Sequence, residues 1–212
     1  MARTKLKRLV KVKDLPNVFQ FNTIGIGGLI REYFKSADIF TLEIGCGQGD
    51  YSYELAKKFP ERNFIGVDVK GARIFHGANK ALNENLTNVA FIIGRAEKLD
   101  DIFKPKSIEE IYIPFPDPHI RRANHGRRLI SSNYLKMYKY LLTNEGTVHF
   151  KTDNQNLFEY AMRVIKEFRG EIIFSSENLY EENSKFVDVI ITSFEDHYIK
   201  EGRKIKFISF KL

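Results

Sequence analysis

From about residue 39 the chain alternates short apolar runs with amphipathic segments, which is the pattern of strands joined by helices. Parallel strands joined in this way form an open sheet with helices on both faces, so the pattern predicts an α/β fold. The predicted strands are IFTLEI (39–44), NFIGVDV (63–69), NVAFII (88–93), IEEIYIPF (108–115), GTVHFKT (146–152) and EIIFS (171–175), and the predicted helices lie at 51–59, 70–85, 131–142 and 154–169.

The C-terminal part of the chain has a different pattern. FVDVIITSF (186–194) and RKIKFISF (203–210) have apolar residues in mostly alternating positions, and only eight residues separate them. Two such segments with so short a connection are expected to pair antiparallel at the edge of the sheet. The whole pattern therefore predicts a Rossmann-like, doubly wound sheet that is mostly parallel, with an antiparallel C-terminal edge strand.

The charge of the chain is concentrated in two regions. Of the net charge of +7, residues 1–35 hold +6, from eight Lys/Arg against two carboxylates. Residues 1–20 show no clean period, so we predict a flexible basic arm there and a single domain over residues 21–212. Binding of a polyanion is favoured, although solvated charged faces are the simpler alternative. The second basic region, between Asp117 and Glu145, has no carboxylate and contains Arg121, Arg122, Arg127, Arg128, Lys136 and Lys139.

The cysteine and hydropathy patterns exclude several classes of protein. One cysteine cannot form an internal disulfide, and the absence of CxxC and HxxxH spacings argues against a structural metal site despite five histidines. No apolar run approaches the roughly 18 residues of a membrane helix, and the basic start lacks the apolar stretch of a signal peptide. We therefore expect a soluble, cytoplasmic protein with no bound metal and no membrane contact.

A glycine-rich loop, EIGCGQG, ends the first predicted strand and precedes a predicted helix. Gly45, Gly47 and Gly49 allow a tight turn and the close approach of a nucleotide-like ligand. A dinucleotide fingerprint would have a third glycine where this chain has Asp50, which argues against NAD. Glu43 can pair with a cationic ligand group, and S-adenosylmethionine carries a sulfonium and an ammonium group. A tight turn without a ligand is the alternative.

Asp68 ends the second predicted strand, 19 positions after Gly49. In this fold a carboxylate at that place can accept hydrogen bonds from both hydroxyls of an adenosyl ribose. An exposed aspartate with no ligand is the alternative. The spacing of loop and carboxylate is compatible with one shared cofactor.

Three prolines in the segment PFPDP (114–118) exclude both a continued strand and a helix. The loop is therefore expected to be rigid and to hold Asp117 at the carboxyl end of the sheet, where ligands bind in open α/β folds. Asp117 could instead cap the next segment or pair with Arg121. Because two arginine pairs follow, a carboxylate is expected beside a cationic surface.

At this point the sequence resembles the bacterial tRNA (guanine-N7)-methyltransferases over about residues 40–205. The glycine loop is common to most methyltransferases of this fold, whereas the other segments are more specific and occur in the family's order. The matching segments are LEIGCGQGDY (42–51), NFIGVDV (63–69), PFPDP with the arginine-rich stretch that ends in RRL (114–129), HFKTDNQNLFEY (149–160) and ITSFEDHYIKEGRKI (191–205).

The resemblance implies a class I methyltransferase that transfers a methyl group from S-adenosylmethionine to N7 of the variable-loop guanosine of tRNA, position 46. Glu43 and Asp68 would hold the methionine and ribose ends of the cofactor, and Asp117 would be the active-site carboxylate. Further implied contacts are Gly45, Gly47, Gly49, Arg95 and Glu97 to the cofactor, Arg121, Asp153, Thr192, Ser193, Phe194 and Glu195 to the target nucleotide, and Arg122, Arg127 and Arg128 to the RNA backbone.

The chain departs from the family's pattern at four of these places. His119 stands where the family has a tryptophan, and Arg121 where it has a lysine. Arg95 aligns with a cofactor-contacting aspartate, so Glu97 is the candidate substitute. Asn124 aligns with a histidine, and His125 is adjacent.

Other functions remain open from the residues themselves. A methyltransferase that acts on another RNA, a small molecule or a protein would share the glycine loop, but the basic regions argue against the last two. A non-catalytic RNA-binding protein on the same scaffold is the alternative of a different class. The expected partner is tRNA, bound by a monomer or homodimer without an obligate protein partner.

Overall fold

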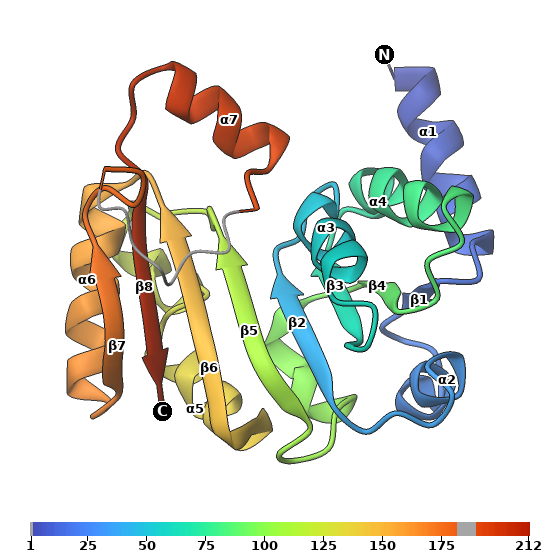
Figure 1. The fold of residues 1–212 in the computed structure, drawn as a ribbon, viewed down its shortest axis with the longest axis horizontal. Helices are drawn as coiled ribbons and strands as arrows, with labels where there is room; N and C mark the ends of the chain where they lie inside the picture. Colours follow the sequence, from blue (N-terminus) through green and yellow to red (C-terminus); the bar gives the residue numbers. More distant parts are fainter. Residues whose placement is uncertain (1, 182–189) are drawn as a thin grey trace.

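The computed structural model describes residues 2–181 and 190–212, which build one eight-stranded sheet with helices on both faces (Figure 1). The strands lie in the order β1, β4, β3, β2, β5, β6, β8, β7. All neighbours are parallel except β8, which is antiparallel to β6 and to β7. The strands are β1 (Val18–Gln20), β2 (Phe40–Ile44), β3 (Phe64–Asp68), β4 (Val89–Ile93), β5 (Ile108–Pro114), β6 (Leu142–Thr152), β7 (Glu171–Ser176) and β8 (Lys206–Lys211).

Two apolar cores lie on the two faces of the sheet. The larger core contains residues of α2, α5 and α6, such as Ile30, Tyr138 and Ile165, and the second contains Tyr53 of α3 and Ala78 of α4. Among the described residues, no helix is long and apolar enough to cross a lipid bilayer. The helices are α1 (Ala2–Lys11), α2 (Ile26–Tyr33), α3 (Asp50–Lys58), α4 (Gly71–Asn83), α5 (Ser132–Leu141), α6 (Gln155–Glu167) and α7 (Ser193–Lys200), with 3-10 turns η1 (Val12–Asp14), η2 (Ala96–Asp101) and η3 (Arg122–Arg127).

The predicted fold class is confirmed, including the antiparallel C-terminal strand. The six strands predicted before residue 180 are all present, and β6 begins four residues earlier than the pattern indicates. The order of the strands follows from neither the pattern nor its spacing. It places β2 and β5 side by side at the centre of the sheet, which brings the glycine loop close to the proline-rich segment.

The strand predicted at FVDVIITSF is wrong in its described part, and its residues 186–189 lie outside the described residues. Residues 190–192 are irregular, and α7 begins at Ser193. The reason is local, because the Thr192 side chain accepts a hydrogen bond from the Glu195 N–H and so caps the helix. The edge position next to β8 is taken by β7 instead.

Residues 1–20 also differ from the expected arm. Residues 2–11 form α1, which packs against α4, and β1 pairs in parallel with β4 at the edge of the sheet (Figure 1). Val12 and Val18 are buried in the second core. Burial of these two valines adds apolar area to the core, which stabilises the ordered N-terminal segment. The folded domain therefore begins before residue 21.

The parallel arrangement has one consequence for function. β2, β3, β4, β5 and β6 all end at the same edge of the sheet, and α7 lies beyond the ends of β5 and β6 (Figure 1). The glycine loop, Asp68, the proline-rich segment and the KTD segment of β6 therefore all reach this edge.

Candidate functional site

The glycine loop between β2 and α3 has the geometry that its sequence requires. Gly45, Gly47 and Gly49 have φ values of 78°, 55° and 77°, which favour glycine. A Cβ at Gly49 would lie 2.4 Å from the Phe91 ring, whereas a Cβ at Gly47 would meet no atom within 4 Å. Gly49 therefore serves packing, and Gly47 borders open space beside the loop.

Asp68 at the end of β3 fastens this loop. Its Oδ2 accepts a hydrogen bond of 2.9 Å from the Gly47 N–H, and its Oδ1 accepts one of 2.8 Å from the Lys70 N–H. Each carboxylate oxygen retains a second lone pair for a ligand. The next residue, Val69, exposes an apolar side chain. A carboxylate, an open glycine turn and an apolar surface therefore lie together.

Glu43 has a different place from the one that the resemblance implies. It is buried in β2, and its Oε2 accepts hydrogen bonds from the backbone N–H and the hydroxyl of Ser52 in α3. Burial raises the pKa of Glu43 to about 8, although the bonds from Ser52 oppose the shift. Glu43 thus ties the helix to the strand, and direct contact with a cofactor ammonium is not what this placement favours.

The candidates for the adenine end, Arg95 and Glu97, lie at the start of η2, directly after β4. Both side chains are exposed. Burial, followed by the charge and hydrogen bond of Glu97, raises the pKa of Tyr134 in α5. Glu97 therefore already has a partner on α5.

The proline-rich segment leaves β5 and exposes Asp117. Two residues that flank Asp117, Phe115 and His119, have positive φ values of 49° and 41°. Non-glycine residues in this region cost of order 1–3 kcal/mol each and persist only where surrounding contacts hold them. One such contact is the Phe115 N–H, which donates to the Lys151 carbonyl at 2.9 Å. The segment is therefore a restrained support for Asp117.

Arg128 supplies the second restraint, which corrects its predicted role at the RNA backbone. Its Nε donates to the Pro118 carbonyl at 2.9 Å, and its guanidinium lies 4.2 Å from the centre of the Tyr160 ring. Only 5% of the residue is exposed. Burial lowers the pKa of Arg128. A side chain so enclosed connects the proline-rich segment to α6 and has little surface left for a phosphate.

The other arginines remain available. Arg121 and Arg127 are exposed at the two ends of η3, and no ion pair to either is present among the described residues. The side chain of Arg122 lies outside the described part of the chain. The predicted cationic surface beside Asp117 therefore consists of Arg121 and Arg127 in the described structure.

The KTD and TSFE segments meet through a buried ion pair. Lys151 Nζ lies 3.0 Å from Glu195 Oε1, and the two side chains are 4% and 0% exposed. The Tyr180 hydroxyl also donates to Glu195 Oε1, at 2.6 Å. Burial lowers the pKa of Lys151, and Glu195 opposes this shift. Glu195 was expected at the target nucleotide, but here it anchors α7 to the sheet.

A second ion pair joins the KTD segment to the residues after α7, because Arg203 lies 2.8 Å from Asp153 Oδ2. Thr192 is the cap of α7, and the side chain of Ser193 is not described. Phe194 is 51% exposed and packs edge-on against Phe115 and Tyr198, with centroid distances of 6.0 and 4.6 Å. Of the predicted TSFE contacts whose side chains are described, Phe194 has the most accessible one, and it lies beside the proline-rich segment.

Lys151, Tyr180 and Arg203 were not identified from the sequence. Lys151 and Arg203 lie within the matched segments, and the position of Lys151 beside Thr152 and Asp153 in the KTD segment was an available signal for it. Tyr180 gave none, because its contact with Glu195 depends on the packing of α7. Among the described residues, no cluster of three or more histidine, cysteine or carboxylate side chains could hold a metal ion.

Comparisons with known proteins agree with this geometry. The family model described as "Putative methyltransferase" matches residues 37–208. A protein named tRNA (guanine-N(7)-)-methyltransferase from Christiangramia forsetii is 36% identical over 221 residues, with 100% of this chain and 99% of the relative covered. A protein of the same name from Bacteroides fragilis is 34% identical over 223 residues, with 100% and 87% covered.

Solved structures support the fold. The 16S rRNA methyltransferase KamB matches with a TM-score of 0.65 at 15% identity, covering 87% of this chain and 93% of KamB. A structure described as an antibiotic related methyltransferase matches with a TM-score of 0.63 at 21% identity, covering 88% and 93%. These structures show the fold alone, whereas the full-length relatives and the family model show that the chain belongs to the tRNA (guanine-N7)-methyltransferase family.

Proposed function

We propose that this protein transfers the methyl group of S-adenosylmethionine to N7 of a guanosine in tRNA, and that the target is the variable-loop guanosine. The observation that carries the proposal is the common sheet edge on which the glycine loop, Asp68 and Asp117 lie, with exposed Arg121 and Arg127 beside them. We place the reaction in the cytoplasm, where tRNA is the abundant substrate.

The described residues fit the cofactor. The open turn at Gly47 leaves room for close backbone approach, and Asp68 has lone pairs for two ribose hydroxyls. The exposed Val69 gives the adenine an apolar surface. S-adenosylmethionine supplies an electrophilic methyl group on sulfur. Since Glu43 is buried against Ser52, the methionine end would be held by backbone groups of the loop.

Guanine N7 carries an in-plane lone pair and needs no deprotonation before it attacks a methyl group. The protein therefore has to orient the base and exclude water rather than supply a general base. Asp117 can accept hydrogen bonds from the guanine edge and balance the positive charge that develops on the ring. The exposed ring of Phe194 offers a stacking surface beside the same loop.

The direct test is a methylation assay with labelled S-adenosylmethionine and unmodified bulk tRNA, followed by digestion of the RNA to identify the nucleoside. We expect label in 7-methylguanosine. A matched pair of transcripts, with guanosine or adenosine at the variable-loop position, tests the site. Label in another nucleoside, or equal label in both transcripts, would contradict the proposal.

Asp68→Ala is expected to weaken binding of S-adenosylmethionine by about 2–3 kcal/mol, which is roughly 30- to 150-fold. Two hydrogen bonds to the ribose would be lost, together with the bond that orients Gly47. Calorimetric titration measures the change, and Asp68→Asn serves as a control that retains an acceptor for Gly47. If the folded alanine variant binds the cofactor as the parent does, Asp68 is outside the site.

Arg127→Ala is expected to weaken tRNA binding and to reduce the slope of log affinity against log salt by roughly 0.7–0.9, because one phosphate contact is lost. Cofactor affinity should not change. Lys104→Ala, on the loop that precedes β5 at the opposite edge of the sheet, is the control of equal charge and should leave the slope unchanged. If the arginine variant and the parent show the same slope of log affinity against log salt, η3 is only a solvated surface.

A further inference from the structure

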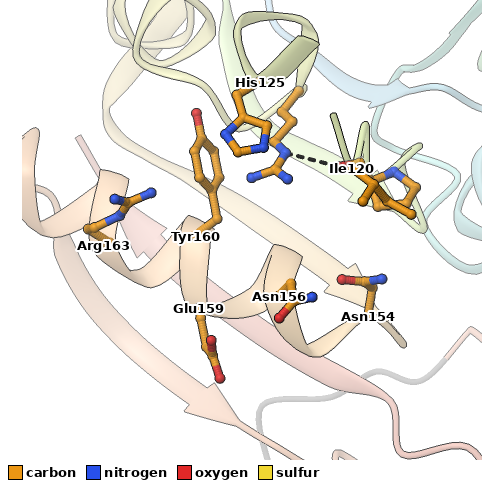
Figure 2. Close-up of a pocket in the computed structure, with 9 residues that line it drawn as sticks. Ile120, His125, Asn154, Asn156, Glu159, Tyr160 and Arg163 are labelled. Carbon is orange, nitrogen blue, oxygen red and sulfur yellow. Dashed lines mark hydrogen bonds between the residues drawn. The ribbon is translucent and has the colours of Figure 1, made fainter. Parts of the chain in front are cut away.

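A cavity of about 520 Å³ lies between Pro118, η3 and α6 (Figure 2). Its size is within the range of pockets that bind small ligands. The site described above does not use its α6 wall. Since Pro118 lines the cavity and directly follows Asp117, the cavity begins one residue from the proposed target site.

One end of the cavity is cationic. Tyr160 rises from α6 toward His125, whose ring lies 5.6 Å from the Tyr160 ring (Figure 2). The buried guanidinium of Arg128 and the exposed one of Arg163 lie 4.2 and 5.4 Å from the centre of the same ring. Arg128 is enclosed and donates to the proline-rich segment, so the exposed guanidinium of Arg163, held over the tyrosine ring, is the group that can receive an anion such as a phosphate.

The other end carries amides and apolar side chains. Asn154 and Asn156 lie at the start of α6, and Ile120 lies across from them (Figure 2). The Asn154 Oδ1 accepts from the Leu157 N–H and caps α6, and Asn154 and Asn156 both line the cavity. Ile120 is 78% exposed, so its apolar side chain is open to a ligand. Amides facing an apolar wall suit the edge and face of a planar base.

The single carboxylate of the lining, Glu159, does not cancel this charge. Figure 2 shows its side chain directed away from Tyr160 and His125. Its Oε1 accepts a hydrogen bond of 3.1 Å from Gln155 on the same helix. The cavity therefore combines an anion site at one end with a base site at the other. A nucleotide has the matching parts, a charged phosphate and an uncharged base.

We propose that this cavity binds a second nucleotide of the tRNA, adjacent in the strand to the guanosine that is methylated. This inference rests on the proposed function. The phosphate would lie at Arg163, and the base would lie between Ile120 and the amide of Asn156. Binding of this neighbour would fix the strand on both sides of the proline-rich segment, so that the target base is held against Asp117.

The test compares two variants with a matched control. Asn156→Ala removes the amide at the base end of the cavity, and Arg163→Gln removes the charge at the anion end. Both residues are exposed, so the fold should be retained. Lys166→Gln removes one charge from the same helix, one turn further on and outside the cavity. We expect tRNA affinity to fall about tenfold in each cavity variant and to be unchanged in the control, the scale of one lost base or phosphate contact.

A second measurement uses tRNA in which the nucleotides flanking the target are made abasic one at a time. One abasic position should weaken binding to the parent about tenfold and leave binding to Asn156→Ala nearly unchanged, because the contact is then already lost. Equal losses for parent and variant at every position overturn the proposal.

Two further results distinguish a failure of this inference from a failure of the proposed function. If the parent methylates tRNA and both cavity variants match it, this inference is wrong and the proposed function stands. If the parent methylates no tRNA, the proposed function fails instead. Adenosine or guanosine monophosphate that binds the parent but not the variants, while tRNA affinity is equal in all, would also overturn the proposal in favour of a free nucleotide.

Discussion

Asp117→Asn is expected to lower single-turnover methyl transfer by on the order of a hundredfold or more, the scale seen when one electrostatic group is removed from an active site. Asparagine keeps the size of the side chain and one acceptor but loses the charge that would balance the methylated guanine. The affinity for tRNA should fall much less, because most of the binding energy comes from phosphates away from the target base. Rapid-quench measurement with enzyme in excess gives the rate of transfer at saturation, and its dependence on enzyme concentration gives the affinity for tRNA.

Asp101→Asn, at the end of η2, is the matched control and should behave as the parent does. Since N7 needs no base, the rate of the parent should also stay nearly flat from pH 6 to 9. Near-normal transfer by the Asp117 variant would mean that the carboxylate only supports its loop. A parental rate that rises tenfold per pH unit would indicate a deprotonated nucleophile, and hence a target atom other than N7.

Lys151→Met is expected to destabilise the protein by about 3–5 kcal/mol, because it leaves the carboxylate of Glu195 buried without its cation. For a chain of this size the melting temperature should fall by roughly 6–20 °C. Thermal and urea unfolding measure the effect. Methyl transfer should fall too, because Glu195 anchors the helix that carries Phe194.

The double variant Lys151→Met with Glu195→Gln removes both charges while keeping an acceptor for Tyr180. Most of the lost stability should return, since replacing a buried ion pair by uncharged groups is often neutral. If the double variant is as unstable as the single one, packing of the lysine stem matters more than its charge. A single variant with parental stability would show that the pair is hydrated in solution.

Much of the fold was readable from local pattern. The strands, the helices between them and the position of the glycine loop each depend on residues within a few positions of one another. For the same reason, three glycines with positive φ and a rigid proline-rich loop could be expected before any contact was known. The exceptions among the elements were α1 and β1, where an arm was expected, and α7, where one threonine cap outweighed the alternating pattern that precedes it.

The site depended more on tertiary structure. The sequence predicts that Glu43 contacts the ligand. In the structure Glu43 is buried within the parallel sheet and accepts a hydrogen bond from the Ser52 N–H. Arg128 reads as one of four equivalent arginines, but of the three whose side chains are described it alone lies beneath the proline-rich segment and against Tyr160. A side chain's exposure depends on residues far away in the chain, and no local pattern reports it.

The sequence by itself determined the elements, the mostly parallel sheet and the candidate residues at the ends of its strands, because backbone preferences and apolar periodicity act over a few residues. Only the tertiary structure decided which charges remain exposed and which are paired. Lys151 and Glu195 are 44 positions apart and meet only once α7 packs beside β6. Their attraction becomes strong because burial removes water from both groups, and that burial is a property of the assembled fold.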